Sequence, residues 1–221
     1  MSVTKKGFSS KEIQKQLGLK RYEPVWAMVH KLRKAMGTRD ERYTLEGMIE
    51  FDEGYFTVES SEIEQEKGIR GRGAAGKQNV AVMAESTPLE NIETGQESRS
   101  CRYFKAKVLE THLSLEINET IKESIDNQSI VFTDKSTSYV DISDFVELHI
   151  TEKSDKETTK ETLKWVHITI SNAKRNLLGN YHKIKRKYLQ LYLNEFIYKL
   201  NRRYFGDKLF ERLIIANITA I

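Results

Sequence analysis

The sequence predicts an α/β fold in which a mixed sheet is flanked by helices and preceded by a small helical segment. Short apolar runs with partial alternation, typical of strands that bury a face, occupy the middle of the chain. Segments with apolar residues at helical spacing stand before and after them. In two of the predicted strands an acidic residue interrupts or ends the apolar run, and a buried carboxylate needs a physical reason.

Composition limits the class of protein. The chain has 221 residues, enough for one large domain with a core of ordinary size. The net charge of +4 permits nucleic-acid binding without demanding it. No run of about 18 apolar residues occurs, and the first ten residues lack a signal-peptide segment, so we expect a cytoplasmic protein with no membrane partner. The single cysteine, Cys101, excludes an internal disulfide and a cysteine-based zinc site within this sequence.

Residues 8–37 are predicted to form two short helices. Ser9 begins a capping-box pattern ahead of the first helix, and Gly18 is a natural stop. Pro24 suits the first turn of the second helix, which we predict over residues 25–36.

The second helix carries a basic side with Lys31, Arg33 and Lys34. Two short helices joined by a brief turn, the second one basic, are the outline of a helix-turn-helix DNA-binding segment, which we predict over residues 1–40. The alternative is a small helical pair whose charged side is only solvated.

The first acidic strand is predicted over residues 48–58. Glu50, Asp52 and Glu53 stand within its apolar and aromatic residues, followed by Gly54. Converging carboxylates are commonly balanced by a divalent metal. The alternative is that Asp52 and Glu53 begin a polar turn at Gly54.

The second acidic strand lies within residues 128–139, where the apolar run 130–132 stops at Thr133 and Asp134. A buried strand that ends in an aspartate is a common way for a sheet to present a ligand at its edge. The alternative is that Asp134 only initiates a turn.

The middle of the chain supplies the remaining elements. Strands are predicted over residues 79–85 and 101–109, a helix over 113–125 and a solvated loop over 151–164. The order is therefore strand, strand, strand, helix, strand, with acids on the first and fourth strands. This order is the ribonuclease H-like arrangement, in which those two strands are neighbours and their acids meet. We expect this domain to cover residues 45–210.

A further ligand is expected from a helix predicted over residues 165–179, where the candidates are His167 and Asn172, followed by Lys174. His167 and Lys174 are seven residues apart, two turns along one helical face, so a metal ligand and a cation near the phosphate could share a site. Asn172 and Lys174 would not share a face. A carbonyl oxygen of Asn suits magnesium, whereas imidazole suits manganese or zinc better, so both candidates remain open.

Two other stretches are basic: a glycine-rich loop at residues 60–76 and a long helix predicted over residues 181–205. Both could lie along a nucleic-acid backbone, and the alternative for the helix is a solvated charged face. The residues that we expect to contact DNA there are Arg70, Arg72, Lys183, Lys185 and Arg186.

Four blocks of the sequence, IEFDEGYF, FTDKSTSY, WVHITISNAKRNLLGNYH and YLNEFIYKLNRRYF, resemble those of bacterial insertion-sequence transposases of the ISXO2-like group, a branch of the DDE superfamily. The resemblance extends over nearly the whole chain from about Phe8. It implies that Asp52 and Asp134 are the two aspartates of the site. Family members carry either Glu seven residues before a Lys or an Asn at the third position, and here those positions hold His167 and Asn172.

The resemblance implies a DNA transposase that cleaves and transfers strands with Mg²⁺ or Mn²⁺. Asp52, Asp134 and Asn172 would be metal ligands, with two ions about 4 Å apart, and Lys174 would steady the charge of the phosphate. The implied partners are DNA, both element ends and target, and a second copy of the chain in a homodimer or larger synaptic complex. The alternatives are a catalytically inactive DNA-binding remnant and a nuclease that cuts without joining. Fuller members begin with a cysteine zinc ribbon, which this sequence does not contain. The two alternatives are a truncated copy, with impaired recognition of the terminal repeats, and a ribbon that lies in sequence outside these 221 residues.

Overall fold

The computed structural model describes residues 7–59, 76–90, 97–111, 113–153, 162–181 and 184–219. They fall into two compact units. We call Tyr43–Phe56 with Lys77–Ser171 the sheet unit, and Met1–Arg42 with Thr57–Gly76 and Asn172–Ile221 the helical unit. Among the described residues, no helix is both long and apolar enough to cross a membrane. The predicted division into residues 1–40 and 45–210 stays a prediction.

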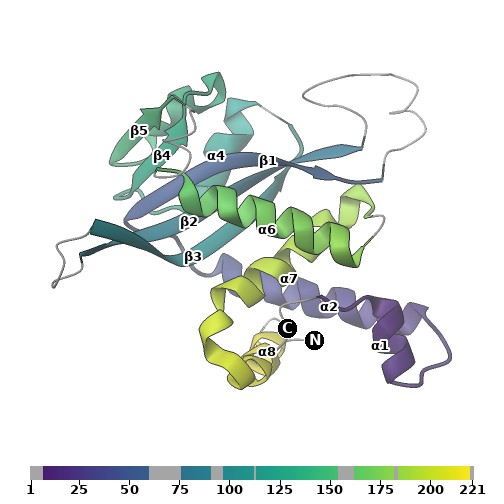
Figure 1. Ribbon diagram of the computed structural model, residues 1–221. Coiled ribbons are helices and arrows are strands. Elements are labelled where there is room, and N and C mark those ends of the chain that lie inside the picture. Colours follow the sequence, from purple (N-terminus) through teal and green to yellow (C-terminus); the bar gives the residue numbers. More distant parts are fainter. Residues whose placement is uncertain are drawn as a thin grey trace. The chain divides into compact units, whose positions relative to one another are not determined.

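The sheet unit is built on one five-stranded sheet with the order β3-β2-β1-β4-β5 (Figure 1). β2 and β3 are antiparallel, whereas β4 pairs in parallel with both β1 and β5. This mixed order is the ribonuclease H-like one, so the predicted fold class and the predicted adjacency of the two acidic strands are confirmed. The strands are β1 (Met48–Thr57), β2 (Lys77–Glu90), β3 (Glu97–Leu109), β4 (Ile130–Asp134) and β5 (Leu148–Glu152).

Both faces of the sheet are covered. On one face, α4 (Ser114–Ser124) and the 3-10 helix η1 (Thr137–Asp144) pack over an apolar cluster that includes Phe51, Met83 and Ile121. On the other, the first half of α6 (Lys164–Asn180) packs on β1. Successive side chains of β1 therefore alternate between an apolar cluster and a helix surface.

The helical unit gathers segments from both ends of the chain. Ser9 caps α1 by accepting a hydrogen bond from the Glu12 amide at 3.1 Å, and Gly18 follows that helix with a φ of 64°, so both predicted helix signals are confirmed. Met36 of α2 and Tyr198 of α7 share a buried cluster with α8 residues. The helices are α1 (Ser10–Gln16), α2 (Glu23–Glu41), η2 (Arg186–Tyr188), α7 (Leu189–Asn201), η3 (Arg203–Lys208) and α8 (Leu209–Ile218).

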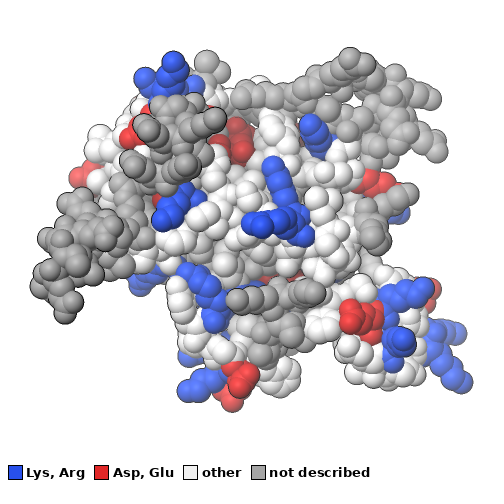
Figure 2. All heavy atoms as spheres, viewed as in Figure 1, with Lys and Arg blue, Asp and Glu red and all other residues white. Residues whose placement is uncertain are grey.

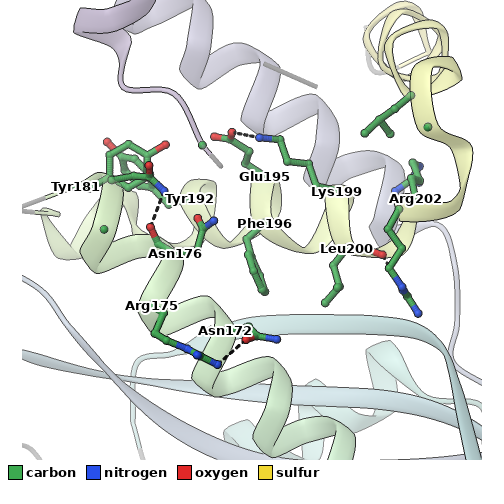
Figure 3. A pocket seen from close by; sticks show the side chains of 16 residues that line it. Asn172, Arg175, Asn176, Tyr181, Tyr192, Glu195, Phe196, Lys199, Leu200 and Arg202 are labelled. Atoms are coloured by element: carbon green, nitrogen blue, oxygen red, sulfur yellow. Dashed lines mark hydrogen bonds and ion pairs between the residues drawn. The ribbon is translucent and has the colours of Figure 1, made fainter. Parts of the chain in front are cut away.

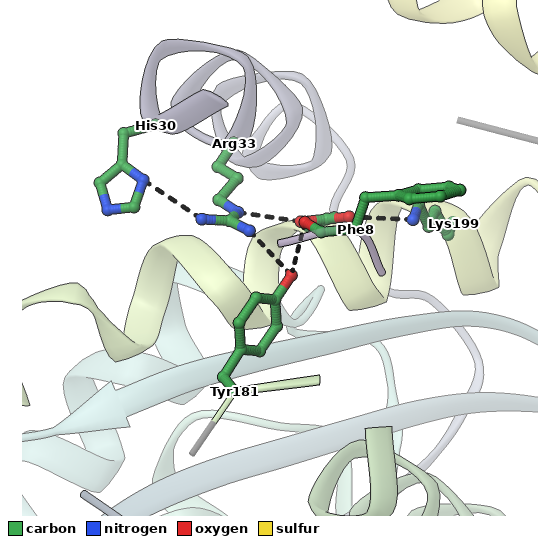
Figure 4. A network of polar contacts seen from close by, with 6 residues as sticks. Phe8, His30, Arg33, Tyr181 and Lys199 are labelled. Carbon is green, nitrogen blue, oxygen red and sulfur yellow. Dashed lines mark hydrogen bonds and ion pairs between the residues drawn. The ribbon is translucent and has the colours of Figure 1, made fainter. Parts of the chain in front are cut away.

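A network of polar contacts lies inside the helical unit (Figure 4). The side chain of Arg33 is 0% exposed and meets Glu195 Oε2 at 2.9 Å, while Lys199 meets the other carboxylate oxygen at 2.9 Å. Arg33 also donates to the Tyr181 hydroxyl at 2.9 Å and lies 3.2 Å from His30 Nδ1. The expectation that Arg33 belongs to an exposed basic side is therefore wrong, because its guanidinium is the counterion of a buried carboxylate.

Three segments differ from the sequence predictions. β1 continues past Gly54 to Thr57, so the alternative of a polar turn at Gly54 is wrong. β5 was not predicted. The single helix expected over residues 181–205 is divided, because α7 begins only at Leu189 and ends at Asn201.

Candidate active site

The pairing of β1 with β4 brings the two predicted aspartates together. Met48 pairs with Ile130 and Glu50 with Phe132, in parallel. The pairing ends there, and the same offset continued by two residues makes Asp52 the counterpart of Asp134 at the end of β4. Because side chains alternate along a strand, both carboxylates lie on the face that α6 covers, where Asp52 meets His167 and the charge of Asp134 acts on the same ring.

His167 meets this pair from the first turns of α6. Its Nδ1 lies 3.7 Å from Asp52 Oδ2, which is longer than a hydrogen bond. Burial lowers the pKa of His167, against an opposing pull from the carboxylate of Asp134. His167 is therefore in electrostatic contact with both aspartates. Its imidazole is neutral at pH 7, which is the form that binds a metal.

Asn172 and Lys174 lie farther along the same helix. Asn172 stands five residues beyond His167, about 140° around the helix axis, and its Oδ1 accepts a hydrogen bond from Arg175 at 2.8 Å. Lys174 lies two helical turns beyond His167 on the same face. The structure thus brings His167 to Asp52, and it brings Asn172 to Arg175; which of them is the third site residue stays a prediction.

Tyr139 and Glu53 extend the group on the opposite face of β1, and neither was among the predicted site residues. Tyr139 is 2% exposed, and its hydroxyl donates to Glu53 Oε2 at 3.1 Å. The other Glu53 oxygen accepts a hydrogen bond from Asn79. Burial raises the pKa of Tyr139 strongly, and the carboxylates of Glu53, Asp52 and Asp134 raise it further. Glu53 therefore binds the buried hydroxyl directly, while Asp52 and Asp134 act on it through their charge from the other face of β1. The sequence signal was a tyrosine shortly after Asp134.

These residues fit a hard divalent cation. Among the described residues, no group of three or more His, Cys, Asp or Glu side chains is arranged to hold a metal. Mg²⁺ seldom needs such a cage, because it commonly takes one or two carboxylates and completes its shell with water and substrate phosphates. Asp52 and Asp134 supply two carboxylates, and His167 supplies a nitrogen that suits Mn²⁺ better. A cation would also relieve the repulsion among the neighbouring acids.

A separate cavity of about 800 Å³ lies in the helical unit, between the second half of α6 and α7 (Figure 3). Asn172 lines it, together with aromatic side chains such as Phe196. Several of its cationic groups already hold internal partners: Lys199 meets Glu195, Arg175 meets Asn172, and Arg202 meets Asp40. The lining is thus a mixture of apolar surface and paired charges.

The residues predicted to contact DNA have different surroundings. Lys31, Lys34 and Lys185 are exposed, Arg186 is half-buried, and Arg33 is buried as described above. In Figure 2 the Lys and Arg side chains of the described residues form several separate groups on the face in view. Three predicted DNA contacts lie outside the described residues: Arg70, Arg72 and Lys183.

Comparison with known families identifies the chain. Residues 44–201 match the family model of the ISXO2-like transposase domain. The chain belongs to this family. The matched residues of this ISXO2-like transposase include Asp52, Asp134 and both third-position candidates, and the resemblance stated from the sequence is confirmed.

Other comparisons are more distant. No curated protein matches the ISXO2-like transposase in sequence. The chain is similar to the crystal structure of a pre-cleavage Mos1 transpososome, with 11% identity, a TM-score of 0.33 and coverage of 96% of this chain and 74% of that one. It is also similar to the catalytic domain of Mos1 mariner transposase, with 10% identity, a TM-score of 0.31 and coverage of 86% and 93%. The fold assignment rests on the strand order and not on these scores.

Proposed function

We propose that this ISXO2-like transposase cleaves and transfers the DNA strands of an insertion sequence by metal-dependent phosphoryl transfer. The observation that carries the proposal is the pairing of β1 with β4, which makes Asp52 and Asp134 neighbours while His167 Nδ1 approaches Asp52 to 3.7 Å. Membership of the transposase family supports the substrate class, DNA.

In this proposal, Asp52 and Asp134 hold Mg²⁺ or Mn²⁺, and either His167 or Asn172 completes the site. A bound divalent ion makes an attacking water or 3′ hydroxyl a better nucleophile and stabilises charge on the phosphate. The Tyr139 hydroxyl donates to Glu53 at 3.1 Å, and this hydrogen bond joins β1, next to Asp52, to η1. Lys174, two turns beyond His167, steadies the negative charge of the phosphate.

DNA is the proposed partner, both as element ends and as target. The exposed Lys31, Lys34 and Lys185, with the half-buried Arg186, are proposed to contact the phosphate backbone. Arg70, Arg72 and Lys183 remain proposed contacts by their sequence position alone. Because transposition joins two element ends, a homodimer or larger synaptic complex is proposed as the working assembly.

The test is a cleavage and joining assay on DNA that carries the native element ends, with Mg²⁺ or Mn²⁺. The wild type is compared with Asp52→Asn, Asp134→Asn, His167→Ala and Asn172→Ala. We expect both Asp variants to bind DNA and to join no ends. Of His167→Ala and Asn172→Ala, we expect one to be inactive, and that variant identifies the third site residue. Binding without cutting by the wild type would favour a DNA-binding remnant, and cutting without joining would favour a nuclease.

A further inference from the structure

Glu50 is a buried acid that the proposed chemistry does not use. It stands in β1, two residues before Asp52, and it is 0% exposed. One carboxylate oxygen, Oε2, accepts hydrogen bonds from the backbone amides of Trp165 at 2.7 Å and Val166 at 3.1 Å. These amides belong to the first turn of α6, where backbone N–H groups have no partner within the helix and the helix dipole favours an anion. Glu50 therefore caps a helix through the amide of Trp165, which lies 115 residues later in the chain.

Two other contacts between β1 and α6 accompany the cap. Because side chains alternate along a strand, Glu50, Asp52 and Gly54 point to the same face. Asp52 meets His167, and a Cβ atom added at Gly54 would stand 3.0 Å from Ile170 Cγ2. Gly54 thus lets the helix approach the strand more closely than any other residue would.

These contacts follow the same order along both elements. Glu50, Asp52 and Gly54 of β1 meet, in turn, the amides of Trp165 and Val166, the ring of His167 and the side chain of Ile170. A shift of α6 by one residue would move its groups by about 1.5 Å and turn them by about 100°, which would take His167 away from Asp52.

We infer that Glu50 is a positioning residue, which holds the first turn of α6 so that the imidazole of His167 faces Asp52. The inference rests on the proposed function in one respect: the proposed function assigns His167 to the catalytic site. It concerns hydrogen bonds to two amides, so its direct consequences are measurable in the protein without DNA.

The test compares Glu50→Ala and Glu50→Asp with a matched control, Glu85→Ala. The Asp variant keeps the charge but is too short to reach both amides. Glu85 is likewise buried, at 2% exposed, and accepts hydrogen bonds from the Tyr43 hydroxyl and the Glu46 amide, away from α6. The readouts are hydrogen exchange at Trp165 and Val166, the NMR signals of the His167 ring, and the Mn²⁺ concentration that half-saturates binding.

We expect both Glu50 variants to exchange the two amides faster, to shift the His167 ring signals and to need on the order of tenfold more Mn²⁺. Glu85→Ala should lose stability without these changes. If Glu50→Ala does not fold, Glu50→Asp carries the test. Wild-type His167 signals and Mn²⁺ binding in a folded Glu50 variant would overturn the inference. A wild type that never cuts DNA would overturn the proposed function instead, because the exchange and ring signals do not depend on catalysis.

Discussion

Two regions of the molecule surround their acids with opposite charges. In the helical unit, the carboxylate of Glu195 has a cation on each oxygen, Arg33 and Lys199, both at 2.9 Å. In the sheet unit, Glu53 accepts a hydrogen bond from the Tyr139 hydroxyl, and the negative charges of Asp52 and Asp134 act on the same hydroxyl. The first arrangement cancels charge, whereas the second collects charge of one sign.

The difference separates a structural role from a functional one. A buried ion pair is costly to break, because removal of one partner leaves a charge without compensation. A group of like charges stores repulsion in the folded state and is relieved when a cation binds, which is typical of sites selected for activity at some expense of stability. We therefore expect substitutions in the helical unit to change stability and those in the acid group to change activity.

The largest expected effect is on catalysis. Asp52→Asn and Asp134→Asn should each lower strand joining by more than about a hundredfold, since even residues behind a metal ligand cost 10- to 100-fold. Their stability in urea should equal or exceed that of the wild type, because each change removes one of the like charges. Joining within tenfold of the wild type, or a large loss of stability, would argue against a functional role for these two acids.

Next in size is the change Arg33→Met, which should lower the free energy of unfolding by about 3 kcal/mol, because Glu195 loses its fully buried partner. The double variant Arg33→Met with Glu195→Leu should recover most of this loss. Urea denaturation measures both. If the single variant were as stable as the wild type, the ion pair would not be structural.

A smaller effect is expected on the pH dependence of stability, through protonation of His30. Burial, with the charge of Arg33, lowers the pKa of His30 to about 4. The unfolded chain has a His pKa of about 6.5 and takes up the proton first, so stability is complete above pH 6.5 and is lost as pH falls towards 4. Between pH 7 and pH 4.5 the wild type should lose about 2 kcal/mol more than His30→Gln. Equal losses in urea denaturation would argue against a neutral, buried imidazole.

The smallest effect concerns the contact of α6 with β1. Gly54→Ala should cost about 1 kcal/mol, because its methyl group would press on Ile170. Gly179→Ala, in the same helix, is the matched control: nothing lies within 4 Å of its added Cβ, so it should be neutral or slightly stabilising. Thermal unfolding of the two variants compares them, and equal stabilities would argue against the close approach.

The sequence predicted what depends on local pattern. Alternating apolar residues located β1, and the stop of the apolar run located Asp134, so the strand order and the pair of aspartates could be inferred. The fifth strand, β5, was missed because it holds only two apolar residues, Leu148 and Ile150, and its last two residues fall in the polar stretch 151–164 that was predicted to be a loop.

What depends on distant partners could not be read from local pattern. Arg33 looks like a surface cation until Glu195, 162 residues away, is placed beside it. In the same way, the acids of β1 gave no sign that Glu50 reaches a helix 115 residues later or that Glu53 binds Tyr139, 86 residues away. Such roles follow from tertiary contacts that composition and spacing do not encode.

The proposed chemistry depends on a divalent-metal site formed by the acids of β1 and β4. Mn²⁺ binding followed by electron paramagnetic resonance tests it without DNA, for the wild type, Asp52→Asn, Asp134→Asn and, as a control acid on the same sheet, Glu85→Gln. We expect both Asp variants to lose the tightest Mn²⁺ site while Glu85→Gln keeps it. Equal Mn²⁺ affinity in the wild type and both Asp variants would contradict this expectation.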